Sequence, residues 1–193
     1  MKIEHTFKTK CHNLKSLFEK VDTLSKFMRN LEKQSLIDPN RYDTNKYLGD
    51  GFEFFIEIFL KLHSVDNRMG VYNYEPVQKD DNGVDGVGIN INNEKSVVQI
   101  KYRSNKKTRL TSTYDHLSHL FSDGMLKHNV VSDPDNSKNY RHFVFTTAEG
   151  LHFYTDKEMF KNKVRCVGYK ELKSMIDKNQ PFWDKLRSIL WMY

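Results

Sequence analysis

Cysteine is scarce in this sequence, and the two cysteines lie far apart in the chain. Cys11 and Cys166 cannot form the set of bridges that stabilises small secreted domains. Neither belongs to a CxxC pair near a histidine cluster, which argues against a structural zinc site. We therefore expect two inert thiols.

Long apolar runs and low-complexity tracts are also missing. The longest apolar stretch, FFIEIFL at residues 54–60, is too short to span a membrane and contains a glutamate. The N-terminal MKIEHTFKTKCHNLKS has no apolar segment of the kind found in signal peptides. With only 4 prolines and 9 glycines, the chain does not have a disordered composition. We expect a soluble intracellular protein, in the cytoplasm or associated with the nucleoid.

Several catalytic signatures cannot be found either. GVDGVG, at residues 83–88, lacks the spacing and the following helix of a phosphate-binding loop. No Ser/His/Asp or Cys/His arrangement can be recognised. In DHLSH, His116 and His119 could touch one metal ion, but no third ligand is near in the sequence. We expect these histidines to be surface or packing residues.

Aromatic residues and positive charge, by contrast, are well represented. Aromatics make up 13% of the 193 residues and apolar residues 38%, enough for one domain with a substantial core. The net charge of +6 permits binding to a polyanion but does not require it. A basic protein without such a partner is equally compatible with this charge.

The hydrophobic pattern alternates between helical and strand periods. Apolar residues three and four apart predict helices at 12–37, 46–63 and 111–128, and two closing helices at 169–177 and 182–193. Strands are expected at 84–91, 96–103, 141–147 and 163–168, and residues 70–78, with Pro76, are an edge strand or a lead-in. LHFY at 151–154 would continue or pair with the strand at 141–147. This order predicts an α/β fold with a mixed central sheet flanked by helices. Residues 1–40 would be an N-terminal helical extension and residues 41–193 the core with its C-terminal helices. The apolar stripe of the first helix would be core or a dimer surface.

The hairpin at residues 84–103 carries polar side chains where a buried strand would carry apolar ones. Because side chains alternate along a strand, Gln99 and Lys101 share one face, while Val98 and Ile100 can pack on the other. Asp85 begins the preceding strand, so a carboxylate, a carboxamide and an ammonium group can converge. The neighbouring glycines, 83, 86 and 88, would leave room for a ligand or mark a bulge.

These groups suit a hard divalent cation, which prefers oxygen ligands. Asp85, the side-chain carbonyl of Gln99 and the backbone carbonyl of Ile100 could supply them. Glu53 and Glu57 lie one turn apart on the predicted second helix, and either could complete the set. The pair Phe52-Glu53 makes us prefer Glu53.

In this arrangement the sequence resembles the PD-(D/E)XK nuclease superfamily, and within it the Mrr-like restriction endonucleases. The resemblance rests on three motifs and covers roughly residues 46–178: Phe52-Glu53, Gly83-Val84-Asp85-Gly86 and Gln99-Ile100-Lys101. It implies a restriction-endonuclease-like fold and a metal-dependent DNA phosphodiesterase that uses Mg²⁺, with Mn²⁺ as a substitute. Glu53, Asp85 and Gln99 would be metal ligands or their organisers, and Lys101 the catalytic lysine. Two departures are Val84 where the family has proline and Gln99 where much of it has an acid.

A run of positive charge follows the second strand of the hairpin directly. Such runs are usually solvated surface, but this one leaves the predicted active strand and suits contacts with DNA phosphates. Its members are Arg103, Lys106, Lys107 and Arg109. Thr146 and Thr147, at the end of a later strand, could bond Lys101 or a phosphate, or simply cap the strand.

The expected function is therefore a metal-dependent DNA endonuclease of the restriction type. A homodimer or tetramer would supply the two active sites needed to cut both strands. Alternatives are a structure-specific nuclease, such as a junction resolvase or a repair or homing enzyme, and a DNA-binding module of the same fold without catalysis.

Overall fold

The computed structural model describes residues 14–37, 43–63, 68–77, 83–111, 114–131, 139–152 and 163–190. Its helices are α1 (Leu14–Leu17), α2 (Leu24–Ile37), α3 (Thr44–Leu62), α4 (Tyr114–His128), α5 (Tyr169–Ile176) and α6 (Gln180–Leu190). Its strands are β1 (Tyr72–Pro76), β2 (Gly86–Ile89), β3 (Lys95–Lys101), β4 (Leu110–Thr111), β5 (His142–Thr146), β6 (Leu151–His152) and β7 (Val164–Val167). The α/β class expected from the sequence is confirmed.

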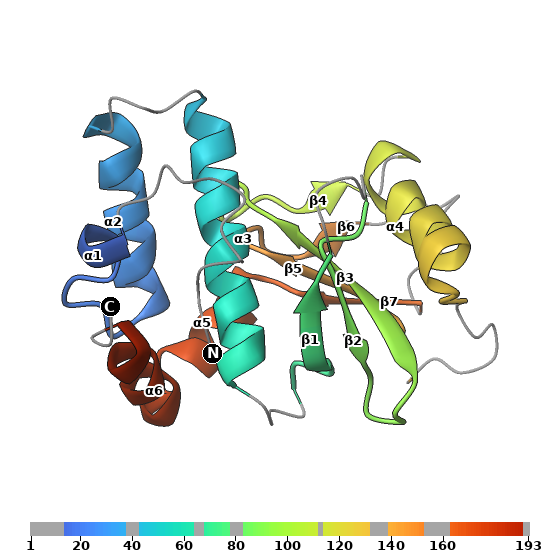
Figure 1. The fold of residues 1–193 in the computed structure, drawn as a ribbon. Coiled ribbons are helices and arrows are strands. Elements are labelled where there is room, and N and C mark those ends of the chain that lie inside the picture. Colours follow the sequence, from blue (N-terminus) through green and yellow to red (C-terminus); the bar gives the residue numbers. More distant parts are fainter. Residues whose placement is uncertain are drawn as a thin grey trace.

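The central sheet is mixed, with the strand order β1-β2-β3-β5-β7. Strands β1, β2 and β3 pair antiparallel, whereas β3, β5 and β7 run parallel. Helix α4 lies on one side of this sheet, and α1, α2, α3, α5 and α6 lie on the other (Figure 1). The hairpin β2–β3 therefore sits at the centre of the sheet, between two helical layers.

Helix α3 is the longest helix and begins at a well-defined cap. The side chain of Asp43 accepts hydrogen bonds from the backbone N–H groups of Asn45 and Lys46, which would otherwise be unpaired at the helix start. From Tyr47 onward most residues of α3 are buried, since α3 packs between the sheet and helix α2. This packing sets the position of α3 relative to β3.

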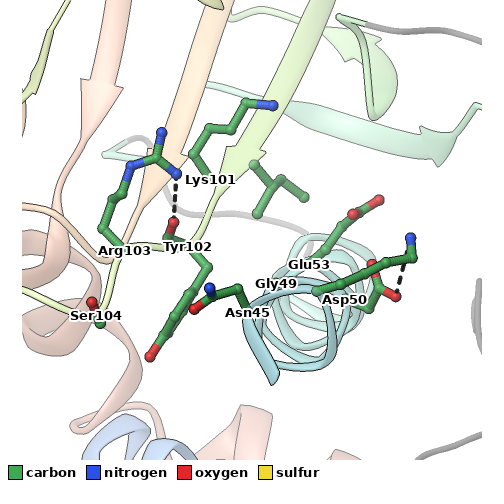
Figure 2. Close-up of a pocket in the computed structure, with 10 residues that line it drawn as sticks. Asn45, Gly49, Asp50, Glu53, Lys101, Tyr102, Arg103 and Ser104 are labelled. Atoms are coloured by element: carbon green, nitrogen blue, oxygen red, sulfur yellow. Dashed lines mark hydrogen bonds and ion pairs between the residues drawn. The ribbon is translucent and has the colours of Figure 1, made fainter. Parts of the chain in front are cut away.

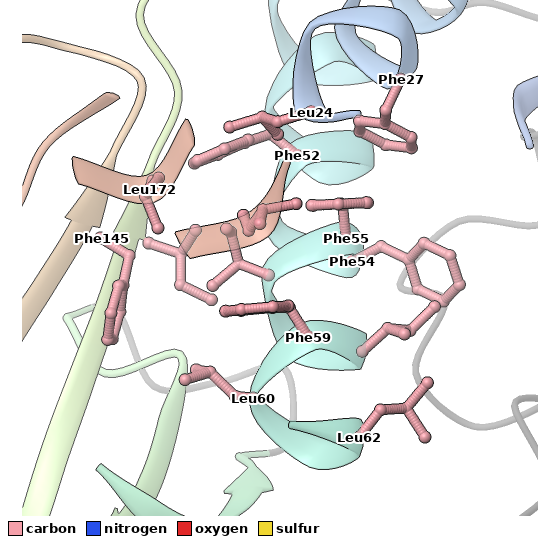
Figure 3. Close-up of a cluster of buried hydrophobic side chains, with 14 of the residues drawn as sticks. Leu24, Phe27, Phe52, Phe54, Phe55, Phe59, Leu60, Leu62, Phe145 and Leu172 are labelled. Carbon is pink, nitrogen blue, oxygen red and sulfur yellow. The ribbon is translucent and has the colours of Figure 1, made fainter. Parts of the chain in front are cut away.

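The main core lies between α3 and its neighbours and is rich in aromatic rings (Figure 3). Phe55 of α3 stacks on Phe27 of α2 with ring centroids 4.2 Å apart, and Phe59 meets Phe182 of α6 edge to face at 4.8 Å. On the sheet side, Val98 and Ile100 are buried in this cluster. The prediction that these two residues pack on one face of the strand is confirmed.

The N-terminal helical prediction needs one correction. The expected helix at 12–37 is interrupted between α1 and α2, where Lys20 has a φ of 52° and Thr23 accepts a hydrogen bond from the N–H of Lys26. The apolar stripe nevertheless stays buried across the break, through Leu17, Val21 and Leu24. It belongs to the same core as α3, α5 and α6, so it is not an exposed dimer surface.

The segment after β5 was also assigned wrongly from the sequence. Strand β6 neither continues nor pairs with β5, but runs parallel to β4 in a separate two-stranded sheet. Strand β4 is too short for a sequence pattern to reveal.

Within the described ranges, no helix combines the length and the apolar character needed to cross a membrane.

Candidate functional site

A polar cleft opens where the first turns of α3 face the end of β3. Its volume is about 380 Å³. Lys101, Tyr102 and Arg103 come from the end of β3, and Asn45, Gly49 and Glu53 lie along α3 (Figure 2). Lys46, Asp50, Ile100 and Ser104 complete its lining. Of the residues expected from the sequence, the cleft thus brings together Glu53, Ile100, Lys101 and Arg103.

Asp85 is fixed beside this cleft by the backbone of β3. Its N–H donates to the carbonyl of Val98 at 2.8 Å, and its Oδ2 accepts from the N–H of Ile100 at 2.6 Å. These bonds place one carboxylate oxygen of Asp85 against Ile100, which lines the cleft. The hairpin therefore brings Asp85 against the second strand, as the return of the chain through the turn predicted.

Gln99 and Lys101 share a face as predicted, but only Lys101 reaches the cleft. Both line a separate small cavity of about 10 Å³ on the α4 side, with Leu117 of α4 and Val144 of β5 among its other walls. Gln99 is only 3% exposed, and its Nε2 donates to the carbonyl of Gly83 at 3.0 Å. The carboxamide of Gln99 is thus a buried link between β3 and the segment that carries Asp85.

The choice between the two glutamates of α3 has a geometric answer. Glu53 lines the cleft, whereas Glu57 is only 1% exposed and accepts a hydrogen bond from the hydroxyl of Tyr74 at 3.3 Å. Glu53 is therefore the helix carboxylate that a ligand in the cleft can reach, and Glu57 is a buried group behind it.

Tyr74 of β1 is a site-adjacent residue that the sequence reasoning missed. Its hydroxyl lies 3.2 Å from the backbone carbonyl of Asp85, as well as near Glu57. Burial, followed by the negative charges of Glu57, Asp85 and Glu53, raises the pKa of Tyr74 well above its ordinary value. The phenol of Tyr74 is therefore neutral at ordinary pH and can donate its hydrogen bond to Glu57 or to the carbonyl of Asp85. The alternating pattern of YNYEP was the available signal, because it places Tyr74 on the inner face.

The glycines around Asp85 do not leave room for a ligand. A Cβ atom on Gly86 would lie 2.2 Å from the ring of Tyr74, and one on Gly83 would lie 2.5 Å from the backbone of His119. A Cβ on Gly88 would lie 2.8 Å from the carbonyl oxygen of Tyr72. The chain itself fills these spaces, so that expectation was wrong. The bulge that was the alternative lies on β1, between Tyr72 and Glu75.

The basic run after β3 is divided between the cleft and the protein's own acids. Arg103 lines the cleft, and its Nη1 donates to the carbonyl of Tyr102 at 2.8 Å. Lys106 pairs with Glu32 at 3.7 Å and lies over the ring of Tyr169, while Arg109 pairs with Glu149 at 3.6 Å. Lys107 is exposed. Arg103 and Lys107 are the members best placed to meet a phosphate.

The two threonines at the end of β5 act on the backbone. The Oγ1 of Thr147 accepts from the N–H of Arg103 at 2.5 Å and donates to its carbonyl at 2.7 Å. The Oγ1 of Thr146 accepts from the N–H of Ala148 at 3.0 Å. Of the two roles considered, capping is the one the geometry displays, and Thr147 also holds the segment that enters the cleft.

In the described part of the chain, no three side chains of His, Cys, Asp or Glu lie close enough together to hold a metal ion. The side chain of His116 lies outside the described residues, and His119 is exposed. Burial raises the pKa of the Cys166 thiol to about 12, so this cysteine is protonated at neutral pH. Two carboxylates, Glu53 and Asp85, with the Ile100 carbonyl, are the oxygen set that a hard cation could use.

Comparison with known proteins adds no further constraint. No family model, curated protein or solved structure matches this chain. The site therefore has to be interpreted from its own residues.

Proposed function

We propose that this chain is a metal-dependent endonuclease that hydrolyses DNA phosphodiester bonds on a restriction-endonuclease-like fold. The observation that carries the proposal is that Glu53 and Lys101 line one cleft. This cleft lies at the end of β3, the strand whose backbone also binds the carboxylate of Asp85. A mixed sheet whose central hairpin supplies both Asp85 and Lys101 is compatible with that fold.

Each residue has a role that follows from its chemistry. Glu53, Asp85 and the carbonyl of Ile100 would hold Mg²⁺ or Mn²⁺, because carboxylate and carbonyl oxygens suit hard cations. Such a cation, when bound, lowers the pKa of a water molecule and polarises the phosphodiester. The ammonium group of Lys101 orients the attacking water or stabilises charge on the phosphate, and Arg103 binds a neighbouring phosphate.

Gln99 would position the segment that carries Asp85. Its amide ties β3 to the backbone at Gly83, two residues before Asp85, and so holds the carboxylate-bearing segment against the catalytic strand. A cut in both strands of a duplex would further require two copies of the site, and a homodimer or tetramer stays a prediction.

The first test is cleavage of plasmid and linear DNA with Mg²⁺, Mn²⁺ or EDTA. Lys101→Ala is expected to reduce the rate by about 100- to 1,000-fold, since it removes a group that stabilises the transition state. Glu53→Gln should cause a similar loss by removing a ligand charge. Lys33→Ala is the matched control, because it removes an exposed lysine of α2 that does not line the cleft and should leave the rate nearly unchanged. Metal-independent cleavage, or full activity in Lys101→Ala, would contradict the proposal.

A second candidate is a DNA-binding module of the same fold without catalysis. The burial of Gln99 favours it, since an uncharged side chain bonded to Gly83 replaces an acid that could have bound a metal. This candidate predicts DNA binding that is unaffected by EDTA and no cleavage with either cation. The same experiment with a binding measurement therefore separates the two.

A further inference from the structure

Helix α3 contains a glycine that the packing of the protein does not require. A Cβ atom on Gly49 would meet no heavy atom within 4 Å. Glycine is the least favourable residue within a helix after proline, so its presence there calls for a reason. Gly124 of α4 has one, because a Cβ there would lie 3.1 Å from Val97 and 3.3 Å from the ring of His142.

The open space beside Gly49 belongs to the cleft. Tyr102 faces it from the end of β3, and Asn45 lies one helical turn before Gly49 on the same wall (Figure 2). The ring of Tyr102 is half-buried and packs against the core, with its centroid 6.4 Å from that of Phe52. A bare stretch of helix, a carboxamide and the remaining surface of an aromatic ring thus border the same cleft as Glu53 and Lys101.

The size and chemistry of this space suit one nucleotide. Sites for small ligands have volumes of about 300–1,000 Å³, and the cleft, at about 380 Å³, is far too small to enclose paired bases. Proteins bind unpaired bases by stacking them on aromatic rings and by hydrogen bonds from polar side chains to the base edges. A glycine allows a sugar–phosphate backbone to approach the helix closely.

We propose that Asn45, Gly49 and Tyr102 form a subsite for one unpaired nucleotide next to the phosphate that is cut. The proposal rests on the proposed nuclease function and narrows its substrate to DNA that is single-stranded or unpaired at the point of cleavage. The base stacks on Tyr102, Asn45 bonds its edge, and the backbone of the nucleotide passes over Gly49 toward Lys101.

Binding of a fluorescent single-stranded oligothymidylate in EDTA tests the subsite without cleavage. Gly49→Gln is expected to raise the melting temperature by about 1–3 °C, because it improves helix propensity, while weakening binding about tenfold or more by filling the cleft. Tyr102→Ala should weaken binding by about 5- to 100-fold, and Tyr102→Phe should bind as the wild type does. A fully paired duplex of the same sequence should compete poorly.

Gly150→Gln is the matched control, because a Cβ on Gly150 would also meet no atom within 4 Å but Gly150 lies outside the cleft. It should bind as the wild type does. Unchanged single-strand binding in both Gly49→Gln and Tyr102→Ala would overturn the subsite, as would equal competition by the duplex.

Cleavage with Mg²⁺ separates the subsite from the proposed nuclease function. If Gly49→Gln still cuts duplex DNA at the full rate, the subsite fails and the nuclease stands. If the wild type cuts no DNA but binding depends on Gly49, the nuclease function fails and the subsite stands only as a binding site for an unpaired nucleotide.

Discussion

The two faces of the central sheet are covered by different kinds of apolar side chain. The face toward α3 is filled by large rings, among them Phe52, Phe55, Phe59 and Trp183, all essentially inaccessible to solvent. The face toward α4 is filled mainly by aliphatic residues such as Val97, Val144 and Leu120. Among the described residues of this second cluster, the only aromatic ring is the partly buried Phe121.

This difference explains where the cleft lies. The aromatic layer holds α3 along most of its length, so the polar residues of its first turns keep a fixed position opposite the end of β3. On the α4 face, Gly124 of α4 instead lies against the buried His142 of β5. The aromatic layer on the α3 face therefore positions the site, whereas the α4 face contains His142, whose protonation depends on pH.

Removing one ring from the α3 face should produce the largest loss of stability. Phe55 contacts rings from α2 and α6, including Phe27 and Trp183. Phe55→Ala is expected to lower the free energy of unfolding by about 3–5 kcal/mol, because it leaves a cavity. Leu120→Ala, at a fully buried position of α4, should cost about 2–3 kcal/mol. Urea denaturation measures both, and an equal or larger loss for Leu120→Ala would contradict the contrast between the faces.

Acid should weaken the α4 face through His142. Burial, with the positive charges of Arg141 and Lys163, lowers the pKa of His142 to about 4. An unfolded histidine has a pKa of about 6.5, so between these values the unfolded state binds a proton that the folded state does not. The free energy of unfolding should therefore fall by about 3 kcal/mol as the pH drops from 6.5 to 4.

His142→Leu should remove this part of the acid sensitivity. Denaturation at several pH values measures it, with His119→Leu, an exposed position of α4, as the control that keeps the loss. If His142→Leu and the wild type lost stability in parallel over this range, another group would be responsible.

A smaller effect is expected where the aromatic face meets the site. Tyr74→Phe removes the hydroxyl that contacts Glu57 and the carbonyl of Asp85. We expect a loss of about 1–3 kcal/mol, since a buried acceptor that is left without its donor costs about that much. Tyr72→Phe, on the same strand but only partly buried, should cost less. Equal unfolding free energies for Tyr74→Phe and the wild type would show that the buried hydroxyl contributes nothing.

The sequence was informative wherever local periodicity decided the structure. Alternation along 96–103 correctly placed Val98 and Ile100 against the core and Lys101 on the opposite side, because a strand has only two faces. The hairpin likewise brought Asp85 to Ile100. Helical periodicity found α3 but not the break at Lys20, since the apolar spacing continues through the break and the core still buries those residues.

Long-range contacts were what the sequence could not supply. Only the fold places the ring of Tyr74 over Gly86 or the carboxylate of Glu149 beside Arg109. Similarly, Glu53 and Glu57 share a helix face in the sequence, and only the position of β1 shows which of them is covered. The role of a glycine or of a charged residue is therefore hard to predict from the sequence, because the residues that contact it come from distant segments.

The double hydrogen bond between Thr147 and Arg103 bears on how the cleft moves. A segment that follows a strand is commonly among the first parts of a protein to open, and its amides then exchange with solvent quickly. Here the N–H of Arg103 is held by the side chain of a fully buried threonine at the end of β5. Its exchange should consequently be as slow as that of the amides within β3. The wall of the cleft that carries Tyr102 and Arg103 would then open only together with the centre of the sheet.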